Sequence, residues 1–288
     1  MSRIDARLLE MQFLARLERD GKIDITGPDD ETAERRMIRS LLVDGYLNDG
    51  FDELRGLDVS IQHELLNRQR WVIGSHIRNV ITGKPMTLKI SHRGRVRLSE
   101  LEQQLKTGRD RDETGLLWAK RHVLVDLAIA ILSASQDAPL SVAFLDMNGL
   151  KAINDTHGHA AGDQAIRSFF QAAVATLGAR GEAYRNGGDE VVVILPGVGD
   201  EEAGKLLDGF ARQLGKDVVV LGDARAEARL TASCGSASTT NPSADAEALL
   251  KLADAAQYGA KAESKKHDPR VSTFAVGGRA VTTHAPGT

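Results

Sequence analysis

The feature that most constrains the fold of this chain is a short apolar run that stops abruptly at a carboxylate. Residues 141–145, Ser-Val-Ala-Phe-Leu, have the length and composition of a buried strand, and Asp146 follows directly. The pattern therefore predicts a carboxylate at the end of a buried strand.

A second acidic point follows in a predicted hairpin. Residues 183–185 and 191–195 are strand-like, and they flank the sequence Asn-Gly-Gly at 186–188. Glycine and asparagine tolerate positive φ, so this sequence is typical of a tight turn between antiparallel strands. Asp189 and Glu190 leave the turn.

If the hairpin lies beside the first strand, Asp146, Asp189 and Glu190 converge on a surface lined by glycine. Glycine has no side chain, so a phosphate group can approach that surface. Carboxylates with room for phosphate suit Mg²⁺, which binds oxygen ligands, commonly one or two carboxylates plus substrate phosphates. Each acidic point alone is an ordinary surface feature, and the functional interpretation depends on their occurring together.

The residues between these points carry a resemblance to a known family. Residues 145–163 (LDMNGLKAINDTHGHAAGD) and 185–190 (RNGGDE) resemble the GGDEF-domain family, the bacterial diguanylate cyclases. The resemblance covers about 112–271, although its opening stretch, DETGL at 112–116, is one residue shorter than the family's usual pattern. It implies a palm-like, ferredoxin-related fold shared with nucleotide cyclases and polymerases.

The resemblance implies roles for individual residues. Asp146 and Asp189 would hold Mg²⁺, or Mn²⁺ in its place, and Glu190 would act as a metal ligand or activate the attacking 3′-hydroxyl. Met147 belongs to the same implied metal site. Asn154 and Asp163 would read guanine, since an amide and a carboxylate offer the donor and acceptors that its edge requires. The other residues expected to bind GTP are Lys151, Gly187, Gly188, Lys261 and Lys265.

Several positions depart from the family pattern. Val191 and Leu150 replace usual phenylalanines, and Gln257 replaces a usual leucine, which makes altered specificity or weak activity conceivable. The family's product-inhibition motif, Arg-x-x-Asp, would fall at Gly178 and Gly181. Product inhibition at that site is therefore expected to be absent.

The length of 288 residues suggests two domains, and the charged segment around 106–113 suggests the boundary. We expect an α+β chain: a regulatory or dimerisation domain at 1–111, a GGDEF domain at 112–271, and a flexible tail at 272–288. The order of elements in the GGDEF domain predicts an antiparallel sheet with helices on one face.

The N-terminal region is predicted to be mostly helical. Helices are expected at 5–19, 29–44, 59–80 and 96–106, with a strand at 87–90, an arrangement that faintly resembles a winged helix. Six basic residues could follow DNA phosphates: Arg70, Arg78, Lys84, Lys89, Arg93 and Arg95. The first sixty residues are mixed or acidic, so a regulatory or dimerising module with a solvated basic face is the favoured interpretation.

The resemblance to the GGDEF-domain family implies a magnesium-dependent enzyme that condenses two GTP into cyclic di-GMP and two pyrophosphates, with each protomer of a homodimer presenting one GTP. The alternatives are a catalytically weak GTP-sensing or DNA-binding regulator and a cyclase that makes another cyclic nucleotide. A net charge of −3 indicates no particular partner. The sequence contains one cysteine and no apolar stretch of the roughly 20 residues that a membrane helix needs, so a cytoplasmic protein without a membrane partner is expected.

Overall fold

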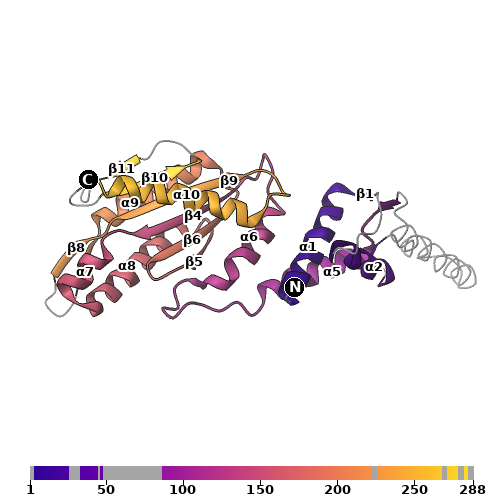
Figure 1. Cartoon of the computed structure of the whole chain (residues 1–288), viewed down its shortest axis with the longest axis horizontal. Coiled ribbons are helices and arrows are strands. Elements are labelled where there is room, and N and C mark those ends of the chain that lie inside the picture. The colour runs from indigo at the N-terminus through magenta and orange to yellow at the C-terminus, as the bar shows by residue number, and fades with distance from the viewer. Residues whose placement is uncertain are drawn as a thin grey trace, which may run out of the picture. The chain divides into compact units, whose positions relative to one another are not determined.

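The computed structural model describes residues 3–25, 33–44, 46–47, 86–221, 226–267, 271–277 and 282–284. It divides into two compact units, Met1–Gly108 and Arg109–Thr288 (Figure 1). The expected boundary was between residues 111 and 112. Arg109, the first residue of the second unit, pairs with Asp126 and Glu182 of that unit. No helix in the described ranges has the length and apolar content needed to cross a bilayer.

The described part of the first unit contains three helices around a small core. They are α1 (Arg3–Asp20), α2 (Ala33–Val43) and α5 (His92–Lys106). A short antiparallel pair, β1 (Ile23–Ile25) and β2 (Met86–Leu88), lies beside them. Apolar side chains such as Met11, Leu14 and Leu101 are fully buried. The expected helix at 59–80 lies outside the described residues, and the winged-helix resemblance stays a prediction.

The basic residues on α5 that the structure describes already have partners within their own unit. Arg95 pairs with Glu18 at 2.9 Å, and the guanidinium of Arg93 lies 5.3 Å from the ring centre of Tyr46. The first three members of the basic set, Arg70, Arg78 and Lys84, lie outside the described residues. DNA binding therefore stays a prediction.

The second unit is built on a mixed sheet, which in the described ranges has seven strands in the order β11-β10-β9-β4-β6-β5-β3. Their bounds are β3 Trp118–Ala119, β4 Leu140–Met147, β5 Glu182–Arg185, β6 Glu190–Pro196, β9 Ala232–Thr239, β10 Ser272–Val276 and β11 Thr282–His284. The central strands β9, β4, β6 and β5 pair antiparallel as expected, but the sheet as a whole is mixed, because β10 pairs parallel to β9 and β3 pairs parallel to β5. The α+β class is confirmed.

Helices cover both faces of this sheet, which corrects the expectation that they cover one (Figure 1). The second unit contains α6 (Val123–Ile131), α7 (Leu150–His157), α8 (His159–Leu177), α9 (Asp200–Lys216) and α10 (Ala246–Ser264). A 3-10 turn (Lys120–His122) precedes α6, and a hairpin of β7 (Val218–Leu221) and β8 (Ala226–Arg229) follows α9.

Two apolar cores result from this arrangement. On one face, α8 and α9 pack Phe169 and Phe210 against the sheet, and on the other, α6 and α10 pack Leu127 and Leu249 against it. Because β4 lies between the two cores, all eight of its residues are buried. This explains why a continuous apolar run precedes Asp146.

The C-terminal segment also differs from expectation. A flexible tail was expected at 272–288, but β10 (Ser272–Val276) is a fully buried strand of the main sheet. Phe274 and Val276 belong to the core beneath α9, and Thr273 Oγ1 donates to the Ala260 carbonyl at 2.8 Å. The described part of this segment therefore completes the sheet.

Candidate metal and nucleotide site

The two acidic points of the sequence meet at one end of the sheet. β4 and β6 pair antiparallel in a register that places Asp146 opposite Glu190. The Met147 amide, just beyond, donates to the carbonyl of Asp189 at 3.3 Å. The hairpin of β5 and β6 therefore lies beside the first strand, as expected. It brings Asp146, Asp189 and Glu190 to the same end of the sheet.

Asp146 is the most buried carboxylate of this group, with 6% of its side chain exposed. Lys261 Nζ, from α10, donates to Asp146 Oδ2 at 2.6 Å. The other oxygen, Oδ1, is buried and has no hydrogen-bond partner in the described part of the chain. Burial raises the pKa of Asp146 above its ordinary value, although Lys261 opposes the shift, and the nearby Asp189 and Glu190 add to it.

The turn of the hairpin is held by its own side chains. Arg185 donates through Nε to the Gly187 carbonyl and through a terminal nitrogen to the Gly188 carbonyl, both at 3.1 Å. Asn186 Nδ2 donates to Glu190 Oε2 at 2.9 Å and so fixes that carboxylate. These clamping roles of Arg185 and Asn186 were missed from the sequence, although both residues stand inside the signature.

The glycines of this turn do not supply the positive φ that the turn sequence indicated. Neither Gly187 nor Gly188 has a positive φ. A Cβ at Gly187 would lie only 2.7 Å from Glu190 Oε2, so glycine leaves room for the catalytic candidate. A Cβ at Gly188 would meet no atom within 4 Å, which leaves an open surface there.

A buried carboxylate outside the predicted site supports the turn. Asp112 accepts hydrogen bonds from the Leu117 amide at 3.1 Å and from Thr114 Oγ1 at 2.8 Å, and it lies 3.5 Å from Arg185. Burial opposes ionisation of Asp112, but these hydrogen bonds and Arg185 outweigh it and lower its pKa. Asp112 thus connects the start of the second unit to the hairpin through Arg185.

The predicted guanine-reading residues lie on α7 and α8, which pack against each other directly after β4. Asn154 is half-buried on α7 and Asp163 is exposed on α8. A Cβ at Gly162 would overlap Asn154 Oδ1, so the glycine beside Asp163 allows the asparagine side chain to lie there.

The three predicted cations differ in their surroundings. Lys261 is brought onto Asp146, whereas Lys151 is exposed near the start of α7 and Lys265 is exposed at the C-terminal end of α10. The structure therefore joins Lys261 to the carboxylates and leaves the other two at the surface.

These carboxylates fit a magnesium ion whose remaining ligands are phosphate oxygens. Among the described residues, no three acidic, histidine or cysteine side chains are grouped so as to hold a metal by themselves. However, Asp146 offers a buried oxygen without a partner, and Asp189 stands close enough to influence its pKa. Magnesium commonly binds through one or two carboxylates plus phosphate oxygens, so these residues fit it.

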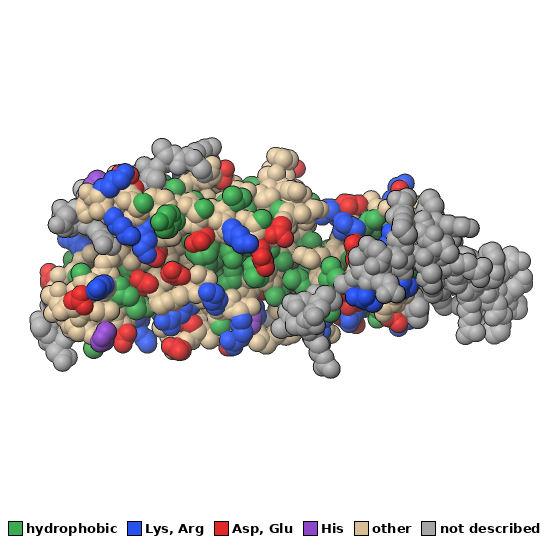
Figure 2. Space-filling view, viewed as in Figure 1, with side chains coloured by type: hydrophobic (Ala, Val, Ile, Leu, Met, Phe, Trp, Pro, Cys, Tyr) green, Lys and Arg blue, Asp and Glu red, His purple; other side chains and the backbone are tan. Residues whose placement is uncertain are grey.

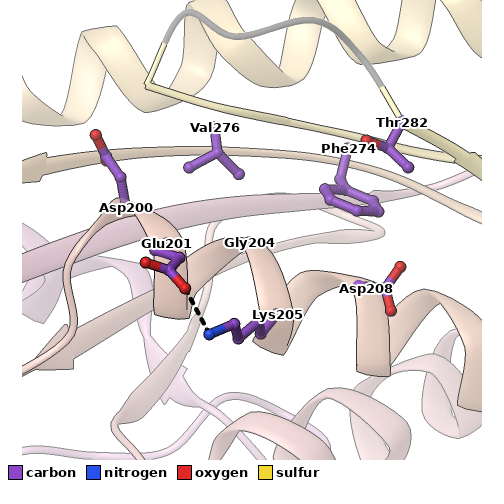
Figure 3. Close-up of a pocket in the computed structure, with 8 residues that line it drawn as sticks. All are labelled: Asp200, Glu201, Gly204, Lys205, Asp208, Phe274, Val276 and Thr282. Carbon is purple, nitrogen blue, oxygen red and sulfur yellow. Dashed lines mark hydrogen bonds and ion pairs between the residues drawn. The ribbon is translucent and has the colours of Figure 1, made fainter.

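A pocket of about 430 Å³ lies elsewhere, between α9, β10 and β11 (Figure 3). Phe274 and Val276 form its apolar wall, and Lys205 turns toward Glu201 at 2.7 Å. Because α9 and Asp146 belong to opposite faces of the sheet, this pocket is separate from the acidic site.

On the surface shown in Figure 2, charges of both signs are interspersed over the second unit.

Comparison with known proteins decides the family. The family described as "Diguanylate cyclase, GGDEF domain" matches residues 110–267, more than half of the chain. The chain belongs to the GGDEF family.

Individual relatives agree with this assignment. The GGDEF chain is 40% identical over 133 residues to an uncharacterized protein in the hutH 5′ region of Streptomyces griseus, covering 43% of this chain and 49% of that protein. It is 32% identical over 123 residues to the diguanylate cyclase DosC of Escherichia coli K12, covering 43% of this chain and 26% of DosC. The chain thus spans about half or less of the length of these relatives.

A solved structure shows the same fold. The GGDEF domain of FimX from Pseudomonas aeruginosa superposes with a TM-score of 0.51 at 20% identity, covering 57% of this chain and 98% of that one. The similarity supports the α+β fold.

The unusual residues of this GGDEF domain have clear positions. Val191 is fully buried opposite Leu145, so it fills a core position of β6. Leu150 packs against the same core from the start of α7. Gln257 is 7% exposed, and its Nε2 has no hydrogen-bond partner in the described ranges. The structure gives no reason for a buried amide at that position.

The backbone at Gly178 and Gly181, where the product-inhibition motif would fall, leaves no room for side chains. A Cβ at Gly181 would collide with the Ile194 carbonyl, and one at Gly178 would lie 2.5 Å from the Val174 carbonyl. Neither position accommodates a side chain on this backbone, so the motif's arginine and aspartate do not fit here.

Proposed function

We propose that this chain is a diguanylate cyclase that condenses two GTP into cyclic di-GMP and two pyrophosphates with Mg²⁺. The observation that carries the proposal is the strand register that sets Asp146 opposite Glu190, with Asp146 Oδ1 buried and unpartnered. It lies in a GGDEF domain whose relatives include the diguanylate cyclase DosC.

In this reaction the 3′-hydroxyl of each GTP attacks the α-phosphate of the other. Each attack forms one bond between that oxygen and phosphorus and breaks the bond to one leaving pyrophosphate, so two attacks close the ring and release two pyrophosphates. Bound Mg²⁺ would supply positive charge where the α-phosphate gains negative charge, with Asp146, Asp189, Glu190 and Met147 as its site. In this proposal Glu190, whose carboxylate accepts a hydrogen bond from Asn186, also receives the proton of the attacking hydroxyl.

The remaining residues of the proposed site bind and orient GTP. Asn154 and Asp163 hold the guanine edge between α7 and α8. Gly188 leaves the surface open to phosphates, and Gly187 leaves room for Glu190. Lys261, Lys265 and Lys151 neutralise the triphosphate.

The product requires two copies of the site. Each GGDEF domain holds one GTP, so two protomers must face each other for the symmetric condensation. In this proposal the N-terminal unit controls that encounter in a homodimer, and the use of GTP places the reaction in the cytoplasm.

The decisive experiment incubates purified protein with GTP, ATP or both in the presence of Mg²⁺ and separates the products by mass. We expect cyclic di-GMP from GTP alone, and none from the double variant Asp189→Ala, Glu190→Ala. The matched control, Glu201→Ala with Asp208→Ala, removes the same charge from α9 on the other face of the sheet and keeps the activity.

Other outcomes would support the alternatives. Cyclic products containing adenine would indicate a cyclase of different specificity. Bound GTP without any product would indicate a nucleotide receptor. A protein that stays monomeric during turnover would contradict the dimer mechanism.

A further inference from the structure

The contact between Lys261 and Asp146 places a cation where the metal is proposed to bind. Lys261 Nζ lies 2.6 Å from Asp146 Oδ2, and that carboxylate has 6% of its side chain exposed. Because the carboxylate is desolvated, its negative charge depends on a positive neighbour for stabilisation. Lys261 is that positive neighbour.

A divalent cation bound to the free oxygen of Asp146 would stand within a few ångströms of the Lys261 ammonium. Like charges at such distances repel strongly in a partly buried site, where water screens them poorly. Metal binding to the nucleotide-free chain must therefore displace Lys261 from Asp146, and the loss of this ion pair weakens the affinity for the metal.

We propose that Lys261 is an electrostatic gate that opposes metal binding at Asp146 until a nucleotide triphosphate arrives. The incoming phosphates carry negative charge that can replace Asp146 as the partner of Lys261, and they also supply oxygen ligands for the metal. Metal and nucleotide then bind with positive coupling. This inference rests on the proposed function and adds that the nucleotide promotes binding of the metal.

The local structure allows the side chain to move while its helix stays fixed. Lys261 is 34% exposed, so its ammonium can reach solvent or a phosphate by rotation of its flexible stem. The backbone of α10 is held beside it, because Thr273 Oγ1 donates to the Ala260 carbonyl and Ser264 Oγ donates to the Val271 carbonyl, both at 2.8 Å. The gate therefore requires only a side-chain rotation.

The test measures Mn²⁺ binding to the full chain without nucleotide, by electron paramagnetic resonance of the free ion. Lys261→Met should bind Mn²⁺ about tenfold more tightly or better than the wild type, in line with the effect of a neighbouring charge on a carboxylate. Lys261→Arg keeps the charge and should bind as weakly as the wild type. Lys251→Met removes a charge from an exposed position of the same helix and should change nothing.

Equal affinities of the wild type and Lys261→Met would overturn the proposal, and so would equal gains in Lys261→Met and Lys251→Met. A second readout uses the wild type alone, in case Lys261→Met does not fold. Acetylation of Lys261, measured by peptide mass against Lys251, should accelerate when Mn²⁺ is saturating, and an unchanged rate would contradict the gate.

These measurements need no turnover. If the chain makes no cyclic di-GMP yet shows the Mn²⁺ effect, the gate holds and the proposed function fails. If it makes the product without the effect, the function holds and the gate fails.

Discussion

At the residue scale, two carboxylates of similar burial are held in opposite ways. Asp146 has 6% and Asp112 has 4% of its side chain exposed. Burial dominates at Asp146 and raises its pKa, whereas hydrogen bonds and Arg185 dominate at Asp112 and lower its pKa. Asp112 therefore stabilises the folded chain as an anion, while the charge on Asp146 is a cost that suits a binding site.

Replacement of Asp112 by asparagine tests its structural role. The amide cannot accept all the hydrogen bonds that Leu117 and Thr114 donate, so we expect Asp112→Asn to lower the free energy of unfolding by about 1–3 kcal/mol at neutral pH. Urea denaturation measures the difference. Asp137→Asn, at an exposed position, serves as the control and should stay within about 0.5 kcal/mol of the wild type.

The pH dependence of this difference follows from the direction of the shift. Asp112 has a lower pKa in the folded chain than its ordinary value of 3.8, so its stabilisation is complete above that pH. The contribution is lost as the pH falls through the folded pKa, where the carboxyl becomes protonated. The variant and the wild type should therefore converge in stability below pH 3.8, and a constant difference would contradict the assignment.

The sequence predicted the identities of the acidic residues better than their contacts. The signature indicated Asp146, Asp189 and Glu190, and the hairpin brings them together. The pairing of Lys261 with Asp146 could not be predicted from local patterns, because 115 positions separate the two residues. Which cation reaches the carboxylate depends on how α10 packs on the sheet.

At the element scale, a polar network fixes the start of the second unit. Arg109 donates to Asp126 on α6 at 2.8 Å and also pairs with Glu182 on β5. Tyr184 Oη lies 2.8 Å from both carboxylates. Burial and the two carboxylates raise the pKa of Tyr184, so it stays a neutral donor. The network joins the first residue of the unit to a helix and a strand.

Removal of Arg109 should weaken this unit strongly. Arg109→Met would leave the buried Asp126 carboxylate without its cation, which we expect to cost about 3 kcal/mol of unfolding free energy. The control is Arg121→Met, whose side chain is 65% exposed beside Asp110 and should contribute less than about 1 kcal/mol. Urea denaturation monitored by tryptophan fluorescence compares the two, and similar losses would contradict the network's role.

The elements themselves were predictable where one pattern dominates. The apolar run before Asp146 and the turn at 186–188 predicted β4 and the β5–β6 hairpin correctly. The helix α6 begins only at Val123, because Trp118–Ala119 before it forms an edge strand beside β5. That pairing joins segments far apart in the chain, which local periodicity cannot indicate.

At the scale of the whole molecule, the sequence did not predict how helices cover both faces of the sheet, nor its strand β10. The order of helices and strands indicated the α+β class, but it did not show that α6 and α10 cover one face while α8 and α9 cover the other. It also gave no sign of β10, because a five-residue strand containing Ser and Thr resembles a polar tail. The strand β10 is buried because it pairs with the edge of β9.

Truncation tests whether this last strand belongs to the folded unit. A chain that ends at His267, where the family match ends, loses β10, which packs against α9 and pairs with the edge of β9. Each buried Phe or Val side chain contributes about 1.5–3 kcal/mol, and a domain has only about 5–15 kcal/mol in total. We therefore expect the chain ending at His267 to lose its cooperative thermal transition. A chain ending at Gly277 keeps β10 and should melt within a few degrees of the full chain, as measured by circular dichroism. Equal melting of all three chains would show that β10 adds no stability, because folding would then be independent of the contacts that Phe274 and Val276 make beneath α9.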